Sequence, residues 1–240
     1  MTTTMIEEVE DQEMSHEDMV ATLISTMEGR IQTYQLLSRL YREEVDEELL
    51  EQMHESLYPV ASGNESVDKG NLLIATQLSN LWANTMVDLA VDYNRTFVGH
   101  GVDAHSAAYP FESVYTSEKR LLMQDARDEV RAIYRSEGLD KGEDWRVGED
   151  HIAVELEFME ILAMRVIEAL ETDKEDEAWH VLMVQKNFLE DHLCSWVPML
   201  IADIHKFAQS DLYRGLAYLT EGFLETDLTF LQDLLMEDGE

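Results

Sequence analysis

Apolar residues recur along most of this chain at intervals of three and four, the spacing that places them on one face of an α-helix. The first such run follows a capping signature at Ser15 and continues to Tyr41. A second helix is predicted after the capping residue Asp46, with Leu57 on its apolar face, and the Tyr58-Pro59 pair is expected to end it. The chain is therefore predicted to open with two helices.

The middle of the chain alternates between polar stretches and apolar periodicity. Residues 60–70 are predicted to form a loop, and residues 71–97 a long helix whose apolar face includes Trp82. Ser117 can cap the next helix, and Gly138 is expected to end it in the left-handed conformation that glycine adopts without strain.

The rest of the chain predicts three or four more helices. Their expected ranges are 150–171, 174–191, 196–207 and 212–236. No β-type alternation is present, and only 3 proline residues interrupt 240 positions, so we expect an all-α helical bundle. The predicted organisation is a disordered acidic tail (1–15), an N-terminal helical half (16–138), a glycine-bearing hinge loop (139–149) and a C-terminal helical half (150–240).

The charge is extreme, with 51 acidic and 17 basic residues and a formal net charge of −34. Nucleic acid is nearly excluded as a partner, because phosphate binding requires clustered lysine and arginine. The apolar content of 45% and the strong periodicity argue against disorder. Acidic residues spread over a folded chain are typical of proteins adapted to a salt-loaded cytoplasm, so a halophilic archaeal origin is expected.

Cysteine usage and hydropathy indicate the compartment. Cys194 has no partner for an internal disulfide, which fits a reducing environment. The first twenty residues are acidic and lack an apolar run, and no uncharged apolar stretch of 18 residues exists. We therefore expect neither a secretory signal nor a membrane span, and a cytoplasmic location.

The Asp150-His151 pair admits three interpretations. A carboxylate beside an imidazole could be a catalytic pair, but no recognisable nucleophile motif accompanies it. Asp150 could simply cap the following helix through its carboxylate. We favour a cap that also shapes a binding groove.

Metal and phosphate sites are not expected. Glu-x-x-His pairs occur at 13–16, 51–54 and 177–180, but Glu51 lies opposite the apolar stripe of its helix. His100 and His105 lie near Asp103 in a glycine-containing loop without a third defined ligand residue, and the glycines form no phosphate-binding fingerprint. We expect no metal and no cofactor.

Four aromatic residues crowd around the loop in the middle of the chain. They are Tyr93, Phe97, Phe111 and Tyr115. Such residues usually belong to the core, yet an apolar groove beside an irregular loop is also a natural peptide-binding site. Arg95 and Arg120, which lie nearby, are expected to pair with acidic residues inside the structure.

Four segments together resemble one protein family. They are residues 92–99, the Pro-aromatic-x-Ser-Val-aromatic turn at 109–115, the Asp-His helix start at 150–159, and residues 188–198 with their Asp-His and Trp-Val-Pro elements. Their order and spacing are similar to those of the TorD/DmsD maturation chaperones over about residues 20–230. One departure is that Val147 and Gly148 stand where the family often has Glu-Pro.

The resemblance implies a function. Members of that family hold the twin-arginine leader peptide, or the immature body, of a molybdoenzyme precursor in the cytoplasm until its molybdopterin cofactor is inserted. Some members are proposed to bind nucleotides weakly, but nucleotide binding is not the function expected of this chain. The residues then expected to bind the client are Tyr93, Phe97, Phe111, Ser113, Tyr115, Asp150 and His151.

The resemblance further implies a protein that is not an enzyme. It is expected to be a monomer or a homodimer that exchanges C-terminal helices through the segment 139–149. Two other classes stay open on the residues alone: a helical metal-dependent enzyme, and a helical regulator that acts through protein contacts without catalysis.

Overall fold

A computed structural model describes residues 15–99, 105–118, 120–142 and 145–237. The helices in chain order are α1 (His16–Arg42), α2 (Glu47–Glu55), α3 (Glu65–Ser79), α4 (Thr85–Tyr93), the π-helical η1 (Asn94–Val98), α5 (Glu112–Thr116), α6 (Asp125–Ser136), α7 (Ile152–Glu171), α8 (Glu175–Phe188), the π-helical η2 (Leu189–Leu193), α9 (Cys194–Phe207) and α10 (Asp211–Glu237). Within the described residues the only β-pairing is an isolated bridge between Phe111 and His151. The predicted all-α class is confirmed.

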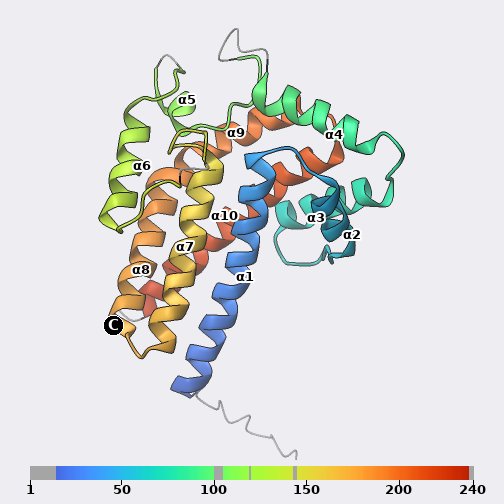
Figure 1. The fold of residues 1–240 in the computed structure, drawn as a ribbon. Coiled ribbons are helices and arrows are strands. Elements are labelled where there is room, and N and C mark those ends of the chain that lie inside the picture. The colour runs from blue at the N-terminus through green and yellow to red at the C-terminus, as the bar shows by residue number, and fades with distance from the viewer. Residues whose placement is uncertain (1–14, 100–104, 119, 143–144, 238–240) are drawn as a thin grey trace, which may run out of the picture.

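Helices from both ends of the chain share one core. Helices α1, α7 and α8 lie side by side, while α10 crosses behind them to pack against α3 (Figure 1). Helix α1 thus packs on α7, which begins at Ile152, 110 residues after α1 ends. The division into two halves joined at residues 139–149 stays a prediction, because residues 143–144 lie outside the described part.

Helix α7 packs between α1 and α8, and most of its residues are apolar. Ile152, Leu156, Met159 and Leu162 are each 0% exposed. Full burial of side chains of this size contributes about 1.5–3 kcal/mol each. Ser38 of α1 donates a hydrogen bond to the Ala153 carbonyl at 2.8 Å, which fixes α1 against the N-terminal turn of α7.

A buried ion pair ties α10 to α1. The Arg30 guanidinium meets the Asp227 carboxylate in a two-pronged contact, with Nε–Oδ1 at 2.5 Å and Nη2–Oδ2 at 2.8 Å. The Tyr34 hydroxyl donates to the same carboxylate at 2.6 Å. Both charged groups are almost fully buried, so the loss of either partner alone would leave an uncompensated charge.

Several predicted helix boundaries are confirmed. The Ser15 hydroxyl accepts from the Asp18 amide, and the Asp46 carboxylate accepts from the Leu49 amide at 2.8 Å. Gly138 has a φ of +69° just after α6, in the left-handed region. No helix within the described residues is long and apolar enough to cross a bilayer.

The predicted loop at 60–70 and helix at 71–97 are wrong in detail. Helix α3 begins at Glu65, because the Asn64 side chain accepts hydrogen bonds from the Ser66 and Val67 amides. The helix then ends at Ser79, and residues 80–84 separate it from α4. Trp82 lies in this break and is 59% exposed, so it does not belong to a continuous apolar face.

Two further expectations fail for local reasons. Leu57 lies beyond the end of α2 and is 94% exposed, so it does not extend the apolar stripe of that helix. Ser117 does not start a helix: its hydroxyl accepts from the Leu121 amide in a loop, and α6 begins only at Asp125. Positive φ angles at Arg120 and Met123 keep this loop out of helical geometry.

Candidate functional site

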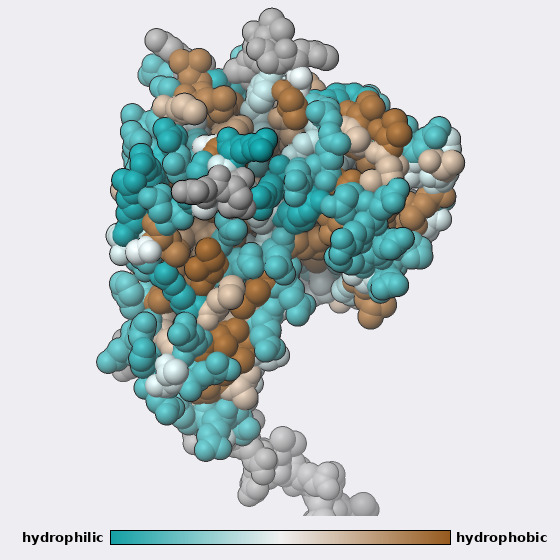
Figure 2. All heavy atoms as spheres, viewed as in Figure 1, coloured by the Kyte–Doolittle hydropathy of each residue, from teal (hydrophilic) through white to brown (hydrophobic). Residues whose placement is uncertain are grey.

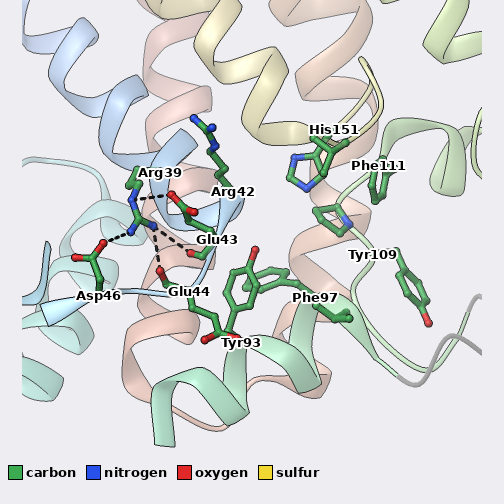
Figure 3. A pocket seen from close by; sticks show the side chains of 13 residues that line it. Arg39, Arg42, Glu43, Glu44, Asp46, Tyr93, Phe97, Tyr109, Phe111 and His151 are labelled. Atoms are coloured by element: carbon green, nitrogen blue, oxygen red, sulfur yellow. Dashed lines mark hydrogen bonds and ion pairs between the residues drawn. The ribbon is translucent and has the colours of Figure 1, made fainter. Parts of the chain in front are cut away.

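A cavity of about 690 Å³ lies where the C-terminal end of α1 meets η1 and the segments that precede α5 and α7 (Figure 3). Its volume is in the range typical of ligand sites. Residues far apart in sequence meet here because α1 packs along α7 and thereby sets its own last turn beside the start of that helix.

One wall of the cavity is aromatic and comes from α4 and η1. The ring centroids of Tyr93 and Phe97 are 5.1 Å apart, and Tyr93 donates its hydroxyl hydrogen to the Tyr41 carbonyl at 2.9 Å. Phe97 follows Tyr93 by four residues, and the π-helical turn between them keeps both rings on the cavity side. Gly99 ends that turn at a φ of +62°.

The opposite wall is built by Phe111 and His151. The backbone segments that carry them pair in the isolated bridge, and the Ile152 amide donates to the Pro110 carbonyl at 3.0 Å. The two rings meet edge to face with their centroids 4.8 Å apart. Gly148 lies directly behind, where an added Cβ would come within 2.8 Å of the Asp150 carboxylate.

His151, rather than Asp150, caps α7. Its Nδ1 accepts a hydrogen bond from the Ala153 amide at 3.1 Å. Burial lowers the pKa of His151 to about 3, so the imidazole is neutral at any physiological pH and Nε2 carries the hydrogen. A base with so low a pKa is poorly matched to proton abstraction near neutrality.

Asp150 holds a different helix from the one that was expected. Its Oδ2 accepts from both the amide and the hydroxyl of Ser113, at 3.1 and 2.5 Å, and its carbonyl accepts from the Glu112 amide. Asp150 therefore caps the short α5 from a distant part of the chain. The prediction that it caps its own helix is wrong, because the backbone turns the side chain toward α5.

The structure brings together four of the seven predicted client-binding residues. Tyr93, Phe97, Phe111 and His151 line the cavity. Ser113 and Asp150 are buried behind its wall, where they fix the segment that carries Phe111. Tyr115 does not line the cavity: its ring stacks on Trp196 with centroids 5.7 Å apart.

The rim of the cavity is charged, and none of its residues was named as part of a site from the sequence. Arg39 forms ion pairs with Asp46 at 2.7 Å and with Glu43 at 3.4 Å, and Glu44 lies beside them (Figure 3). The Arg42 guanidinium lies over the Trp145 ring at 4.2 Å. A charged run at the end of a helix is an ordinary solvated surface by sequence alone, and only the packing of α1 on α7 brings this run to the cavity.

A buried polar network lies behind α5. The Glu112 carboxylate contacts His192 Nδ1 at 3.1 Å, and Glu155 accepts from the Trp196 indole at 3.1 Å. Burial, with the neighbouring Glu112 carboxylate second, raises the pKa of Glu155 well above its usual range. Glu155 is 0% exposed and does not line the cavity, so the network lies behind the site and is not part of it.

The two arginines near the site pair with acids as expected. Arg95 contacts Asp92 at 3.0 Å, and Arg120 contacts Asp203 at 2.9 Å. Asp92 also accepts from the Gln209 and Ser210 amides, so it caps the start of α10 as well. These two arginines therefore serve the fold.

The described part of the chain contains no group of three His, Cys, Asp or Glu side chains placed to hold a metal ion. Both members of the Glu51–His54 and Glu177–His180 pairs are exposed, as expected for Glu51. Glu13, His100 and Asp103 lie outside the described residues.

Comparison with known proteins places the chain in a family. The family model described as nitrate reductase delta subunit matches residues 61–202. The TorD chaperone protein of Vibrio atlanticus is 27% identical over 85% of this chain and 95% of its own length, and that of Vibrio cholerae El Tor is 26% identical over 88% and 95%. A structure from Archaeoglobus fulgidus, provisionally assigned as a redox enzyme maturation protein, is 18% identical and covers 85% of this chain and 93% of its own. Its TM-score is 0.43, which is too low to assign a fold or a function to this chain. The resemblance to TorD-type maturation chaperones is confirmed by the first two comparisons, and the chain belongs to the nitrate reductase delta subunit family.

Proposed function

We propose that this protein is a cytoplasmic, non-catalytic chaperone that binds the precursor of a molybdenum-containing oxidoreductase and assists cofactor insertion. The observation that carries the proposal is the aromatic cavity, in which Tyr93, Phe97, Phe111 and His151 converge from three separate segments. The curated relatives, which are named chaperone protein TorD, support the same function.

The cavity suits a peptide that has both apolar and cationic residues. Its walls are aromatic, and three acidic side chains, Glu43, Glu44 and Asp46, stand at its rim. A twin-arginine leader carries two arginines followed by an apolar stretch. The apolar stretch would pack against the rings, and the arginines would lie near the acidic rim.

The same geometry favours binding over catalysis. The His151 imidazole is neutral with its Nδ1 engaged by a backbone amide, and Asp150 is committed to Ser113. Among the described residues that line the cavity there is no serine, threonine or cysteine to serve as a nucleophile. The polar groups here position the walls.

Calorimetric titration of a twin-arginine leader peptide at molar KCl tests the proposal. Phe111→Ala is expected to weaken binding by roughly tenfold or more, because it removes one wall of the cavity and apolar contacts are not screened by salt. Glu44→Gln is the matched control from the rim. Its effect is expected to be much smaller, since the Debye length is only about 3 Å at 1 M salt.

Asp150→Ala adds a second probe of the same wall. It leaves the Ser113 amide and hydroxyl without their acceptor, so Phe111 loses its support and peptide binding weakens while the helical circular dichroism spectrum persists. Wild-type affinity that collapses as KCl is raised would show that the groove is electrostatic and would contradict the proposal. Normal binding by both Phe111→Ala and Asp150→Ala would place the site elsewhere on the bundle.

A further inference from the structure

Two further hollows lie next to the aromatic cavity, and together the three form a longer groove in the surface. A second hollow of about 500 Å³, between α1 and α2, shares Arg39 and Asp46 with the aromatic cavity. A third hollow of about 480 Å³ shares Gln32, Leu36, Leu49 and Gln52 with the second. Shared walls mean that the three hollows follow one another along the same face of α1. Single hollows of this size accommodate small molecules, whereas three in succession match an extended or helical polypeptide.

The chemical character of the groove changes along its length. The second hollow is polar and is lined by three glutamine side chains and by Glu48. The third hollow is apolar: Met53, Val67 and Phe223 line it, together with Leu57, which is 94% exposed at its edge. The groove therefore has an aromatic end, a polar middle and an apolar end.

The groove is negatively charged around the junction of its first two hollows. Four acidic side chains line these two hollows: Glu43, Glu44, Asp46 and Glu48. They outnumber the two cations there, of which Arg39 is already paired with two of the acids and Arg42 lies over the Trp145 ring. A hydrogen bond from the Leu49 amide, with the neighbouring Arg39 a smaller cause, lowers the pKa of Asp46, so this carboxylate stays ionised. A ligand that spans the groove is thus best matched if its positive charges lie between two apolar stretches.

We propose that the third hollow is a second apolar subsite for the client peptide, which reaches from the aromatic cavity across the acidic part of the groove to Leu57. This rests on the proposed function and adds the length and polarity pattern of the peptide. A second copy of this chain is a poor occupant, because it has 51 acidic residues and only 17 basic ones and so offers few positive charges to the acidic part of the groove.

Synthetic peptides test the second subsite directly. The long probe has an apolar block, two arginines and another apolar block, and two shorter probes each lack one of the apolar blocks. Binding is measured by fluorescence anisotropy at molar KCl to wild-type protein, Leu57→Gln and Phe111→Ala. Val87→Gln is the matched control, because Val87 is an apolar residue on α4 that is 62% exposed and lines none of the three hollows.

The expected result is a split between the two ends of the groove. Leu57→Gln weakens the long probe by roughly three- to tenfold. It does not affect the shorter probe that keeps only the apolar block bound at the aromatic end, whereas Phe111→Ala weakens the binding of that shorter probe. Val87→Gln leaves every affinity unchanged. Because Leu57 is almost fully exposed, its replacement should preserve the helical spectrum, which is recorded as a folding control.

Each other outcome has a defined meaning. If Phe111→Ala weakens the long probe but Leu57→Gln matches Val87→Gln, the second subsite is wrong and the proposed function stands. If the long probe binds no more tightly than the better shorter one, the second subsite is wrong as well. If no probe binds, or Phe111→Ala has no effect, the proposed function fails and the second subsite fails with it. Self-association in sedimentation that Leu57→Gln abolishes would make a second copy the occupant and overturn the proposal.

Discussion

Glu155 carries a fully buried carboxyl group on α7, the helix that packs between α1 and α8. Its Oε2 accepts from the Trp196 indole, and Glu112 and Asp150 lie close enough to disfavour a second negative charge. Burial is the largest cause of its raised pKa. The folded protein therefore prefers this group protonated at pH values where the unfolded chain has already ionised it.

The sign of the resulting pH dependence follows from linkage. A folded-state pKa above the unfolded value of about 4.3 gives stability that is fully present below that value and is lost as pH rises through the folded pKa. Glu155→Gln keeps a neutral acceptor for the indole at every pH. We expect the melting temperature of Glu155→Gln to exceed that of the wild type at pH 7–8, and the difference to shrink toward pH 4.5.

Each unit by which the folded-state pKa is raised costs the wild type about 1.4 kcal/mol of stability at high pH, which a thermal melt can detect. Glu171→Gln, an exposed change on the same helix, is the control and should leave the pH profile unchanged. A pH-independent difference between Glu155→Gln and wild type would mean that the substitution acts through packing, and would contradict the linkage argument.

At the scale of elements, α3 and α10 pack at unusually close range because glycines face one another. A Cβ added to Gly70 would come within 2.7 Å of the Leu219 amide nitrogen and 2.9 Å of the Gly215 carbonyl oxygen. Both contacts are with backbone atoms, which cannot move aside as a flexible side chain could. The helices must therefore separate if the glycine is replaced.

Gly70→Ala is expected to destabilise the protein by about 1–3 kcal/mol, the usual cost of overpacking, even though alanine is the better helix former. Gly29→Ala is the matched control: Gly29 lies inside α1 with no atom near its missing Cβ, so the same change should stabilise by about 0.5–1 kcal/mol. Denaturant unfolding of both variants measures the two signs. Equal effects would mean that helix propensity alone decides, and the close approach would carry no energetic weight.

At the scale of the whole molecule, charge is the dominant feature. Figure 2 shows a face that is mostly hydrophilic, with separate hydrophobic patches, one of them over the region of α4, where Val87 and Val91 are more than half exposed. A formal charge of −34 on a compact body repels itself, and salt at about 1 M screens that repulsion within about 3 Å. The net charge thus opposes compactness most strongly at low ionic strength.

The melting temperature is therefore expected to rise as KCl is added and to fall on dialysis. Thermal melts followed by circular dichroism between low and molar KCl measure this. Glu51→Gln combined with Glu55→Gln removes two exposed like charges one turn apart on α2, and its gain should be largest at low KCl. A melting temperature that is flat or falls with KCl would refute the halophilic interpretation.

The sequence by itself determined the helical class, most helix ends and the family. Periodicity of three and four residues sets which face of a helix is apolar, and local capping chemistry at Ser15, Asp46 and Gly138 acts over only a few residues. Such signals need no knowledge of distant contacts. Tyr93, Phe97 and Phe111 were predicted together because they lie on either side of one loop, close to one another in the sequence.

Tertiary structure alone decided what the polar residues do. Asp150 turns to α5 rather than to its own helix, because Ser113 offers an amide and a hydroxyl there. Arg39 and Asp46 become the link between two hollows only because α1 packs along α7. A charged or capping side chain can satisfy itself with many partners, and which partner is within reach depends on how segments far apart in sequence come together.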